Sequence, residues 1–144
     1  MEKILISACL LGEKCRYDGK SKPIDSAIIK KLQDKYFLIP VCPEVMGGLS
    51  TPRKPCEICG KKVLTEDGAD FTCEYLNGAK AVLSLAKENK VKFCILKNKS
   101  PSCGNSLIYD GSFSGKLINS MGITAELLKS NGYTIYNENQ FDLF

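Results

Sequence analysis

Short apolar runs alternate with amphipathic stretches along this chain, and the alternation predicts an α/β fold. Residues 3–7, 37–41 and 92–96 have the length and apolar content of buried β-strands. Apolar residues spaced three or four apart predict helices over 26–34 and 73–89. Strands separated by helices form right-handed βαβ units. We therefore predict a Rossmann- or flavodoxin-like sandwich with a central, mostly parallel sheet and helices on both faces.

Three further elements complete this prediction. Residues 61–71 are expected to form a small hairpin insertion outside the main sheet, because the Asp-Gly pair at 67–68 favours a tight turn. A last helix is predicted over 123–131, with Gly132 as its left-handed end. Residues 133–136 are predicted to add a closing strand.

The segment between the second strand and the predicted hairpin is rich in proline and glycine. Residues 40–55 contain Pro40, Pro43, Pro52 and Pro55. Such a backbone is predicted to form neither a helix nor a central strand. Long irregular loops of this kind are usually functional or disordered.

Three cysteines follow the three predicted strands. Cys9, Cys42 and Cys103 each lie beyond the end of one apolar run. The carboxyl ends of parallel strands meet at one edge of a sheet, where ligands bind. Neighbouring strands lie ~4.8 Å apart, so three adjacent loops can enclose a site about 10 Å across. This convergence predicts a metal or an inorganic cluster, and the alternative is that the three are ordinary buried thiols.

The composition favours metal chemistry among the uses of these thiols. The chain has eight cysteines and no histidine. Its first residues lead directly into a strand, and no apolar stretch is long enough for a signal core or a membrane span, so we expect a cytoplasmic protein without a membrane partner. Cytoplasmic thiols stay reduced, which makes metal binding or catalysis a better use of them than disulfides. Without histidine, proton transfer must use carboxylates, lysines, tyrosines or thiols.

Length and charge limit the possible partners. With 144 residues the chain is long enough for one domain, residues 1–144, that has its own core. Twenty Lys and Arg against sixteen Asp and Glu leave a net charge of +4. This mild excess suits an anionic small molecule but lacks the basic stripe with interleaved aromatics that is typical of nucleic-acid binding. No nucleic-acid partner is therefore expected, and the sequence leaves the oligomeric state open.

Four other cysteines are candidates for chemistry or for packing in the core. Cys56 and Cys59 form a C-x-x-C pair, which is compatible with a zinc ribbon, a redox dithiol or half of a cluster site. The pair lies in a proline-rich loop rather than at the start of a helix, so we assign it an accessory role. Cys73 and Cys94 fall in a predicted helix and a predicted strand and are expected to belong to the core.

Polar residues near the strand-end cysteines are candidates for proton transfer and substrate orientation. Glu44 lies two residues after Cys42, where its carboxylate can act as a general acid or base, or be a solvated loop carboxylate. Ser100 and Ser102 flank Pro101, so their hydroxyls can orient a substrate or cap a turn.

Glycines and cations at the same predicted edge are candidates for substrate contact. Gly47 and Gly48 allow a ligand to approach the backbone closely, or they make a turn. Cations at this edge can bind a phosphate group, and the alternative is that they are ordinary solvated side chains. These cations are Arg16, Arg53, Lys97 and Lys99.

Three motifs in this order resemble the DUF523 family, which includes the thiouracil desulfidases. The first is SACLLG followed by CRYDG at 7–19, and the second is VCPE followed by GGL and PR at 41–53. The third is KNKSPSCG at 97–104. The resemblance continues to GITAELL at 122–128 and so covers nearly the whole chain.

The resemblance implies a 4Fe-4S cluster held by three cysteines, which map to Cys9, Cys42 and Cys103. One iron would then stay open for the sulfur of a thiolated pyrimidine. It also implies that a carboxylate matching Glu44 activates the water that attacks the ring carbon, and that a serine matching Ser100 assists. Stand-alone members of the family prefer 4-thiouridine monophosphate, so the expected partner is a thiolated nucleobase or nucleotide.

The chain departs from the family at Cys56 and Cys59, where relatives need no thiols. Two other classes of function therefore stay open. One is a carrier of sulfide or of an iron–sulfur cluster that performs no turnover. The other is a structural zinc protein that uses Cys56, Cys59 and Cys73.

Overall fold

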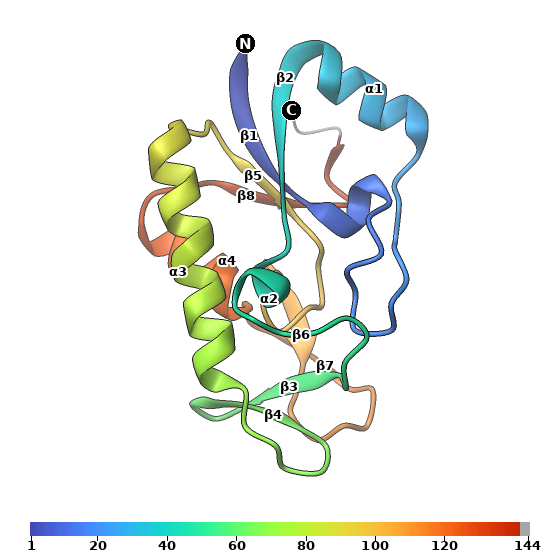
Figure 1. Cartoon of the computed structure of the whole chain (residues 1–144), viewed down its shortest axis with the longest axis vertical. Helices are drawn as coiled ribbons and strands as arrows, with labels where there is room; N and C mark the ends of the chain where they lie inside the picture. The colour runs from blue at the N-terminus through green and yellow to red at the C-terminus, as the bar shows by residue number, and fades with distance from the viewer. Residues whose placement is uncertain (142–144) are drawn as a thin grey trace.

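The central sheet of the protein has four parallel strands. The structure, a computed structural model, describes residues 1–141. Strands β1 (Glu2–Ser7), β2 (Tyr36–Val41), β5 (Cys94–Leu96) and β8 (Ile135–Asn137) lie in the order β2-β1-β5-β8 (Figure 1), and every pairing is parallel. Along the chain these are the second, first, third and fourth strands of the sheet, which is the order of a flavodoxin-like doubly wound fold. The predicted fold class is confirmed.

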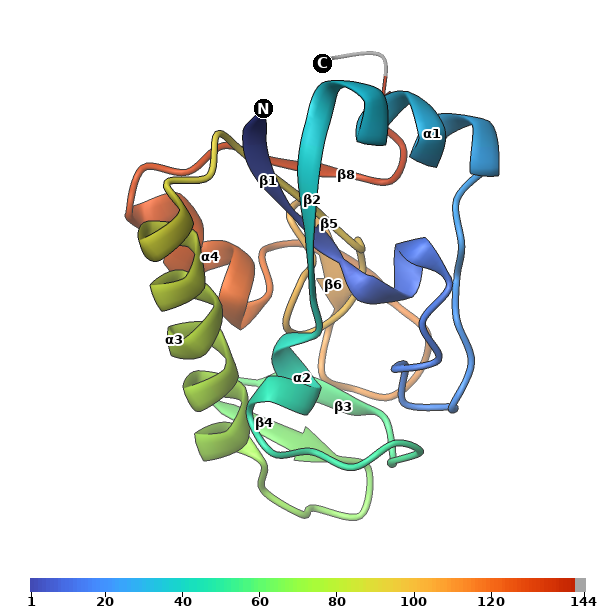
Figure 2. The same ribbon diagram turned by 45° about the horizontal axis from the view of Figure 1, so that its top comes forward.

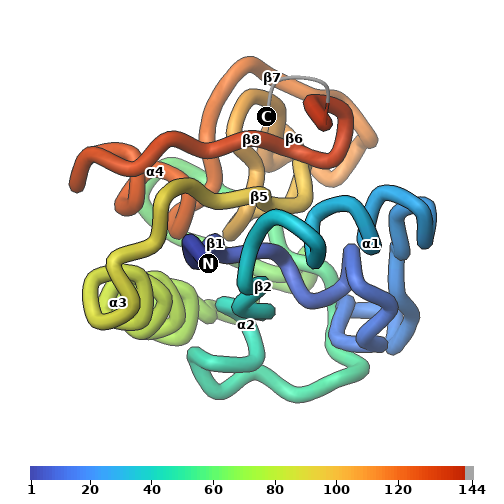
Figure 3. The backbone as a smooth tube through the Cα atoms, turned by 90° about the horizontal axis from the view of Figure 1, so that it is seen from above, coloured from blue at the N-terminus to red at the C-terminus, as the bar shows by residue number. Residues whose placement is uncertain are grey.

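Helices cover both faces of this sheet, as predicted. Helix α1 (Ser26–Lys35) lies on one face, while α3 (Thr72–Asn89) and α4 (Ile123–Ser130) lie on the other (Figure 3). Within residues 1–141, no helix is long and apolar enough to cross a membrane.

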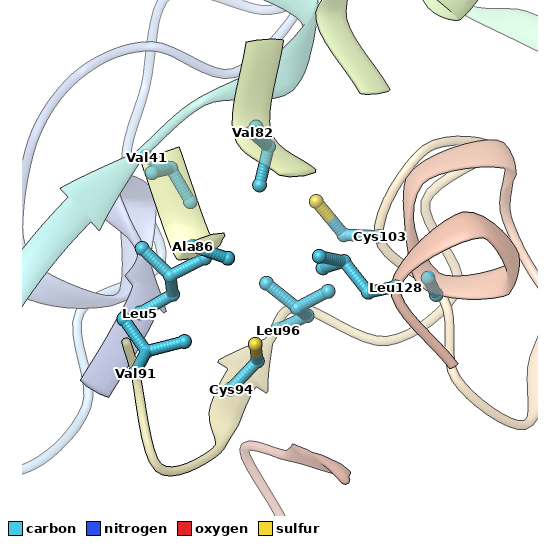
Figure 4. Close-up of a cluster of buried hydrophobic side chains, with 10 residues drawn as sticks. Leu5, Val41, Val82, Ala86, Val91, Cys94, Leu96, Cys103 and Leu128 are labelled. Atoms are coloured by element: carbon cyan, nitrogen blue, oxygen red, sulfur yellow. The ribbon is translucent and has the colours of Figure 1, made fainter. Parts of the chain in front are cut away.

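Two apolar clusters join the helices to the sheet, one on each face. On the α1 side, Ile4, Ile6 and Ile95 of the sheet pack with Leu32. The cluster on the α3 and α4 side is drawn in Figure 4 and consists of Leu5, Val41, Val82, Ala86, Val91, Cys94, Leu96, Cys103, Ala125 and Leu128. Neighbouring residues of a strand point to opposite faces, so a sheet buried on both sides requires the nearly continuous apolar run at 3–7.

Local signals account for several element ends. Helix α1 starts after Asp25, whose Oδ1 accepts a hydrogen bond from the backbone N–H of Ala27 at 2.8 Å. Gly132 follows α4 with a φ of +91°, which lets the chain turn back toward β8. The third and last strands of the sheet begin two residues later than predicted, at Cys94 and Ile135.

The segment rich in proline and glycine contains a helix, contrary to the prediction. Helix α2 (Pro43–Met46) forms a single turn directly after β2. Pro43 occupies its first position, where the missing N–H costs nothing and the fixed φ suits a helix. Gly47 then lets α2 pack closely against Gly78 of α3. Pro40 lies within β2, which is an edge strand and therefore tolerates it.

The predicted hairpin insertion exists, but its strands differ from those expected. Strand β3 (Cys56–Cys59) pairs antiparallel with β4 (Lys62–Thr65). The Asp-Gly pair at 67–68 also makes a turn, but this turn leads only to an isolated bridge between Leu64 and Asp70. The C-x-x-C pair therefore spans a strand rather than a loop.

Burial explains which strands pair in this hairpin. Cys56 and Val63, one from each strand, pack with Tyr75 of α3 and with Leu49 in a third apolar cluster. Residues 69–71 lie along the other edge of β4, where the N–H of Thr65 donates to the carbonyl oxygen of Ala69 and the N–H of Phe71 to that of Val63, and they add only Phe71 to this cluster. The pairing with β3 is the more extensive of the two and buries more apolar surface.

A second hairpin is present that the sequence pattern did not predict. Strands β6 (Leu107–Tyr109) and β7 (Leu117–Asn119) pair antiparallel, and β6 contacts β3. Each strand has three residues, which is too short for an alternating pattern to stand out. Figure 2 shows α2, β3 and β4 together beyond the carboxyl ends of β1 and β2, and Figure 1 shows β6 and β7 beside them.

Candidate active site at the carboxyl end of the sheet

The candidate site lies beyond the carboxyl ends of β1, β2 and β5. The connection after β1 carries α1 on one face of the sheet, whereas the connection after β5 carries α4 on the other. Adjacent strands whose connections diverge leave a crevice, which is where doubly wound folds bind their ligands. A cavity of about 410 Å³ lies at this position.

The three strand-end cysteines all line this cavity. Cys9 lies in η1 (Ala8–Leu11), a short 3-10 helix that follows β1. Cys42 is the N-cap residue of α2 after β2, and Cys103 lies in the turn after β5. Residues far apart in the sequence are thus brought together by the parallel strands, as the strand-end argument expected.

These three thiols come from different layers of the fold. Cys9 is 8% exposed and belongs to the apolar cluster on the α1 side. Cys103 is 5% exposed and belongs to the cluster on the other face (Figure 4). The cavity therefore lies where the two cores meet at the end of the sheet.

Two more thiols line the same cavity. Cys15 lies beside Cys9 and Cys42: its side chain packs against the apolar cluster that contains Cys9, and the Cys42 thiol contacts its carbonyl oxygen at 3.8 Å. Cys56 enters the cavity from β3, beside the buried ring of Tyr75. The cavity therefore has five cysteines in its lining.

The remaining cysteines lie outside this lining. Cys94 is in the core as predicted, and burial raises the pKa of its thiol to about 12. Cys73 is exposed, so its core prediction is wrong. The inward face of α3 starts at Tyr75, and a residue two positions earlier points away from that face. The Cys59 thiol contacts the carbonyl oxygen of Gly111 at 3.5 Å.

The thiols of Cys15, Cys42 and Cys103 favour their protonated forms when no metal is bound. Burial and then the charge of Glu44 raise the pKa of Cys103, while a hydrogen bond with Cys15 and then burial raise the pKa of Cys42. For Cys15, the hydrogen bond with Cys42 lowers the pKa, but the bond with Cys9 and burial bring it to about 11. A metal or cluster that binds here must therefore displace protons.

This donor set fits a cluster better than a single metal ion. Among residues 1–141, no three His, Cys, Asp or Glu side chains are grouped so that they could hold one metal ion. A zinc ion needs its sulfur ligands ~2.3 Å from a common point. An iron–sulfur cluster offers a separate iron to each thiolate, so its ligands need not converge in this way. Soft thiols around one cavity are the donors that such clusters use.

Glu44 lies between a cation and a hydroxyl at the edge of the cavity. Its Oε2 accepts hydrogen bonds from Nε of Arg53 at 3.0 Å and from Nη2 at 2.7 Å. Its Oε1 accepts a hydrogen bond from Oγ of Ser100 at 3.2 Å. One carboxylate oxygen is thus held by Arg53, while the other faces the loop that carries Cys103.

The guanidinium of Arg53 has no N–H left for a substrate. Besides its two bonds to Glu44, it donates to the carbonyl oxygens of Ser50 and Cys15 and to the hydroxyl of Thr51. A guanidinium carries five N–H donors, and these five bonds use them all. The side chain is 8% exposed. The phosphate contact expected for Arg53 would require one of these bonds to break.

Comparison with known proteins identifies the family. The family model of 2-thiouracil desulfurase matches residues 4–140. The chain belongs to this family. Among its relatives is the uncharacterized protein YbbK of Bacillus subtilis (strain 168), which is 44% identical over 149 residues that cover 96% of this chain and 97% of YbbK.

A solved structure of a member named TudS supports the same family and fold. That protein is described as a [4Fe-4S]-dependent thiouracil desulfidase of the DUF523 group. It is 43% identical to this chain, with a TM-score of 0.95 and coverage of 99% of this chain and 95% of that one. The DUF523 resemblance expected from the three motifs is confirmed.

Two of the cations expected at the site line the cavity but face carboxylates. Arg16 forms an ion pair with Asp18 at 3.4 Å. Lys97 forms one with Glu138 at 2.7 Å and also donates to the carbonyl oxygen of Asn98. Their charges are therefore partly neutralised before any ligand binds.

Two other lysines line the cavity without such a partner. Within the described part of the chain, neither Lys22 nor Lys99 has a carboxylate within ion-pair distance. Lys99 was expected at this edge, whereas Lys22 was not. These two ammonium groups are the cations of the cavity that are best placed to meet an anionic ligand.

Three residues expected to contact substrate do not line the cavity. Gly47 uses its missing side chain to approach α3, and Gly48 has a φ of +100° in the turn that follows α2. Ser102 is fully buried, and its hydroxyl lies 2.7 Å from that of Thr124 at the start of α4. These residues hold α2 and the Cys103 loop in place.

Sequence reasoning assigned no role to several residues of the cavity lining, among them Cys15, Lys22 and Tyr75. Cys15 and Lys22 lie in the long loop after β1, and Tyr75 lies on the inward face of α3. Cys15 is part of the CRYDG motif, which was the available signal for it. Nothing in the apolar periodicity distinguishes Tyr75 from a core residue, and burial followed by the charge of Glu44 raises its pKa.

Proposed function

We propose that this protein is a desulfidase that removes sulfur from thiolated pyrimidines with the help of a 4Fe-4S cluster. The observation that carries the proposal is a single cavity in which thiols from three strand ends lie together with the carboxylate of Glu44. Membership in the 2-thiouracil desulfurase family supports the substrate class, and the similarity to TudS supports the cofactor.

In this proposal Cys9, Cys42 and Cys103 hold the cluster, and one iron has no ligand among these three. When bound, the cluster supplies a Lewis acid with high affinity for sulfur. The thiols of Cys42 and Cys103 must lose their protons for this, which their raised pKa values oppose in the metal-free protein. Cluster binding and the loss of the thiol protons are therefore coupled, so these thiolates form as the iron binds.

Glu44 is the general base in this scheme. Its Oε1 takes a proton from the water that attacks the ring carbon, and Oε2 stays bound to Arg53. Ser100 donates to Oε1 and so sets the direction in which this oxygen points. The hydrolysis converts C=S and water into C=O and hydrogen sulfide, so no electrons are transferred and no redox partner is needed.

The proposed substrate is a thiolated nucleobase or nucleotide, and 4-thiouridine 5'-monophosphate is the specific candidate. The cavity volume of about 410 Å³ is in the range of small-molecule sites. Lys22 and Lys99, with Arg16 at the margin, supply positive charge for a phosphate group. A base without a phosphate would forgo these contacts and bind more weakly.

The decisive experiment compares anaerobically reconstituted wild-type protein with the Glu44→Gln variant. The wild type is expected to consume 4-thiouridine monophosphate, with loss of the thiocarbonyl absorbance and release of sulfide. Glu44→Gln is expected to keep its iron and lose at least about 100-fold in kcat, because an amide does not accept the proton. Glu66→Gln, an exposed change on another loop, is the matched control and should leave kcat unchanged.

Two results would contradict this proposal. Full activity of Glu44→Gln would show that Glu44 is not the base. Sulfide binding by the iron-loaded wild type, with the substrate absorbance unchanged, would instead indicate a sulfide carrier.

A further inference from the structure

Cys15 is one of two cavity thiols that the proposed site does not use. It lines the cavity with Cys9 and Cys42, two of the three proposed ligands, packs against the apolar cluster that contains Cys9, and has its carbonyl oxygen 3.8 Å from the Cys42 thiol. We infer that Cys15 is a reversible fourth ligand, which binds the iron left open by the three other cysteines and yields that position to incoming sulfur. The inference rests on the proposed function, because it requires the cluster.

The backbone of Cys15 is anchored at the cavity. Its carbonyl oxygen accepts a hydrogen bond from Nη2 of Arg53 at 3.0 Å and a longer one from the Cys42 thiol at 3.8 Å. Two residues later, the carbonyl oxygen of Tyr17 accepts the backbone N–H of Arg53 at 2.7 Å. Since the backbone is held in this way, the Cys15 thiol changes position mainly by rotation about its own side-chain bond.

The side chain of Cys15 is neither locked in the core nor free in solvent. It is half-buried and packs at the margin of the apolar cluster that contains Cys9. Cys94, by contrast, is fully enclosed and cannot exchange partners. A tethered ligand beside its acceptor has an effective concentration of about the millimolar range. Thiolates are also the usual ligands of iron–sulfur clusters, so a vacant iron beside Cys15 has a ready fourth ligand.

The exchange is balanced without an oxidant or reductant. One bond between iron and the Cys15 thiolate breaks, and one bond between iron and the incoming sulfur forms. The released thiolate takes a proton from solvent, and no electrons are transferred. The three other cysteines keep their bonds, so the cluster stays in place throughout.

Binding of Cys15 to the iron is expected to lower the affinity of the site for external ligands. If Cys15 occupies the iron about nine-tenths of the time, any external ligand binds about tenfold more weakly than it would to the open form. Removal of the thiol is therefore expected to tighten the binding of a small sulfur ligand. The site would then also be spectroscopically different before any ligand is added.

The test uses hydrosulfide as the probe and does not use turnover as a readout. Wild type, Cys15→Val and Cys15→Ser are reconstituted anaerobically, and iron, acid-labile sulfide, the EPR spectrum of the reduced cluster and hydrosulfide affinity are measured. Both variants should keep the iron and sulfide content of the wild type, show a changed EPR spectrum and bind hydrosulfide about tenfold more tightly. Cys73→Ser, at an exposed position of α3, is the control and should match the wild type.

Three results would overturn the inference. Identical spectra and hydrosulfide affinities in wild type and both variants would show that Cys15 only packs beside the cluster. Loss of iron in both Cys15 variants would make Cys15 an obligatory ligand rather than an exchangeable one. Absence of iron from the wild type would refute both this inference and the proposed function. A different outcome would refute the proposed function alone: the wild type binds iron, its EPR spectrum changes when Cys15 is replaced, and it releases no sulfide from substrate.

Discussion

Arg53 shows how a residue expected to bind substrate can acquire another task in the folded protein. From the sequence it is one of several cations near a predicted phosphate site. In the structure it joins the carboxylate of Glu44 to the carbonyl oxygen of Cys15, and its five donors are all occupied. We therefore regard Arg53 as a positioning residue for Glu44 rather than as a phosphate ligand.

Replacing Arg53 by lysine separates these two roles. Lysine keeps the charge but lacks the planar fork that holds Oε2 of Glu44 in place. We expect Arg53→Lys to lower kcat for 4-thiouridine monophosphate by about 10- to 100-fold while KM changes little, because the loss appears in the transition state. Steady-state kinetics of the reconstituted enzyme measure both constants.

Lys22→Ala serves as the counterpart of that variant. Lys22 lines the cavity without a carboxylate within ion-pair distance in residues 1–141, so its loss should raise KM for the monophosphate and leave kcat nearly unchanged. A rise in KM with constant kcat in Arg53→Lys would instead assign Arg53 to the phosphate.

At the scale of elements, the position of α2 depends on a contact between two glycines. Helix α2 carries Glu44 and follows Cys42, and it packs on α3 through Gly47 and Gly78. A Cβ atom at Gly78 would overlap the carbonyl oxygen of Pro43, and one at Gly47 would overlap that of Glu74. These glycines allow the backbones of α2 and α3 to approach each other, and this contact places α2 beside the cavity.

Gly78→Ala tests this contact. Alanine is normally the better helix former, by about 1 kcal/mol. Here the overlap with backbone atoms forces α2 away from α3, and we expect a net loss of about 2 kcal/mol in the free energy of unfolding. Urea unfolding followed by circular dichroism measures this loss.

The neighbouring change Asn77→Ala provides the control for that measurement. Asn77 is exposed on the same helix, so its replacement should alter the free energy of unfolding by less than about 0.5 kcal/mol. If Gly78→Ala were as stable as Asn77→Ala, the close packing of α2 on α3 would not be required.

At the scale of the whole molecule, the two cores share the same sheet. Leu5 and Leu96 point into one core, while Ile4, Ile6 and Ile95 point into the other. A loss of order in either core therefore removes support from strands that the other core needs. This coupling is the physical basis of the prediction that the chain unfolds as one domain.

We therefore expect a single cooperative unfolding transition for the cluster-free protein. Circular dichroism and tyrosine fluorescence should give the same urea midpoint, and the chain has six tyrosines and no tryptophan to report it. Leu128→Ala should lower the free energy of unfolding by about 2 to 5 kcal/mol without a second transition, because Leu128 is fully buried. The half-exposed Ile118 supplies the control, since Ile118→Ala should cost less than about 1 kcal/mol. Two separate midpoints would contradict the single domain.

The sequence by itself determined the elements whose signals are local or strongly periodic. The apolar runs of the first strands, the amphipathic pattern of α3 and the turn at Gly132 are properties of neighbouring residues, so they can be read without knowledge of the fold. The same patterns imply parallel strands, and this is why the cavity location of Cys9, Cys42 and Cys103 could be predicted from their positions after the strands.

Tertiary structure decided the features that depend on which surfaces compete for burial. Strand β4 pairs over its full length with β3, in addition to its short pairing with residues 69–71, because Cys56 and Val63 bury against Tyr75. Arg53 binds Glu44, and Cys15 lines the same cavity as the other thiols, because loops distant in sequence meet at one end of the sheet. Such partners depend on which residues lie close together in the folded chain, and the spacing of residues along the sequence does not give this information.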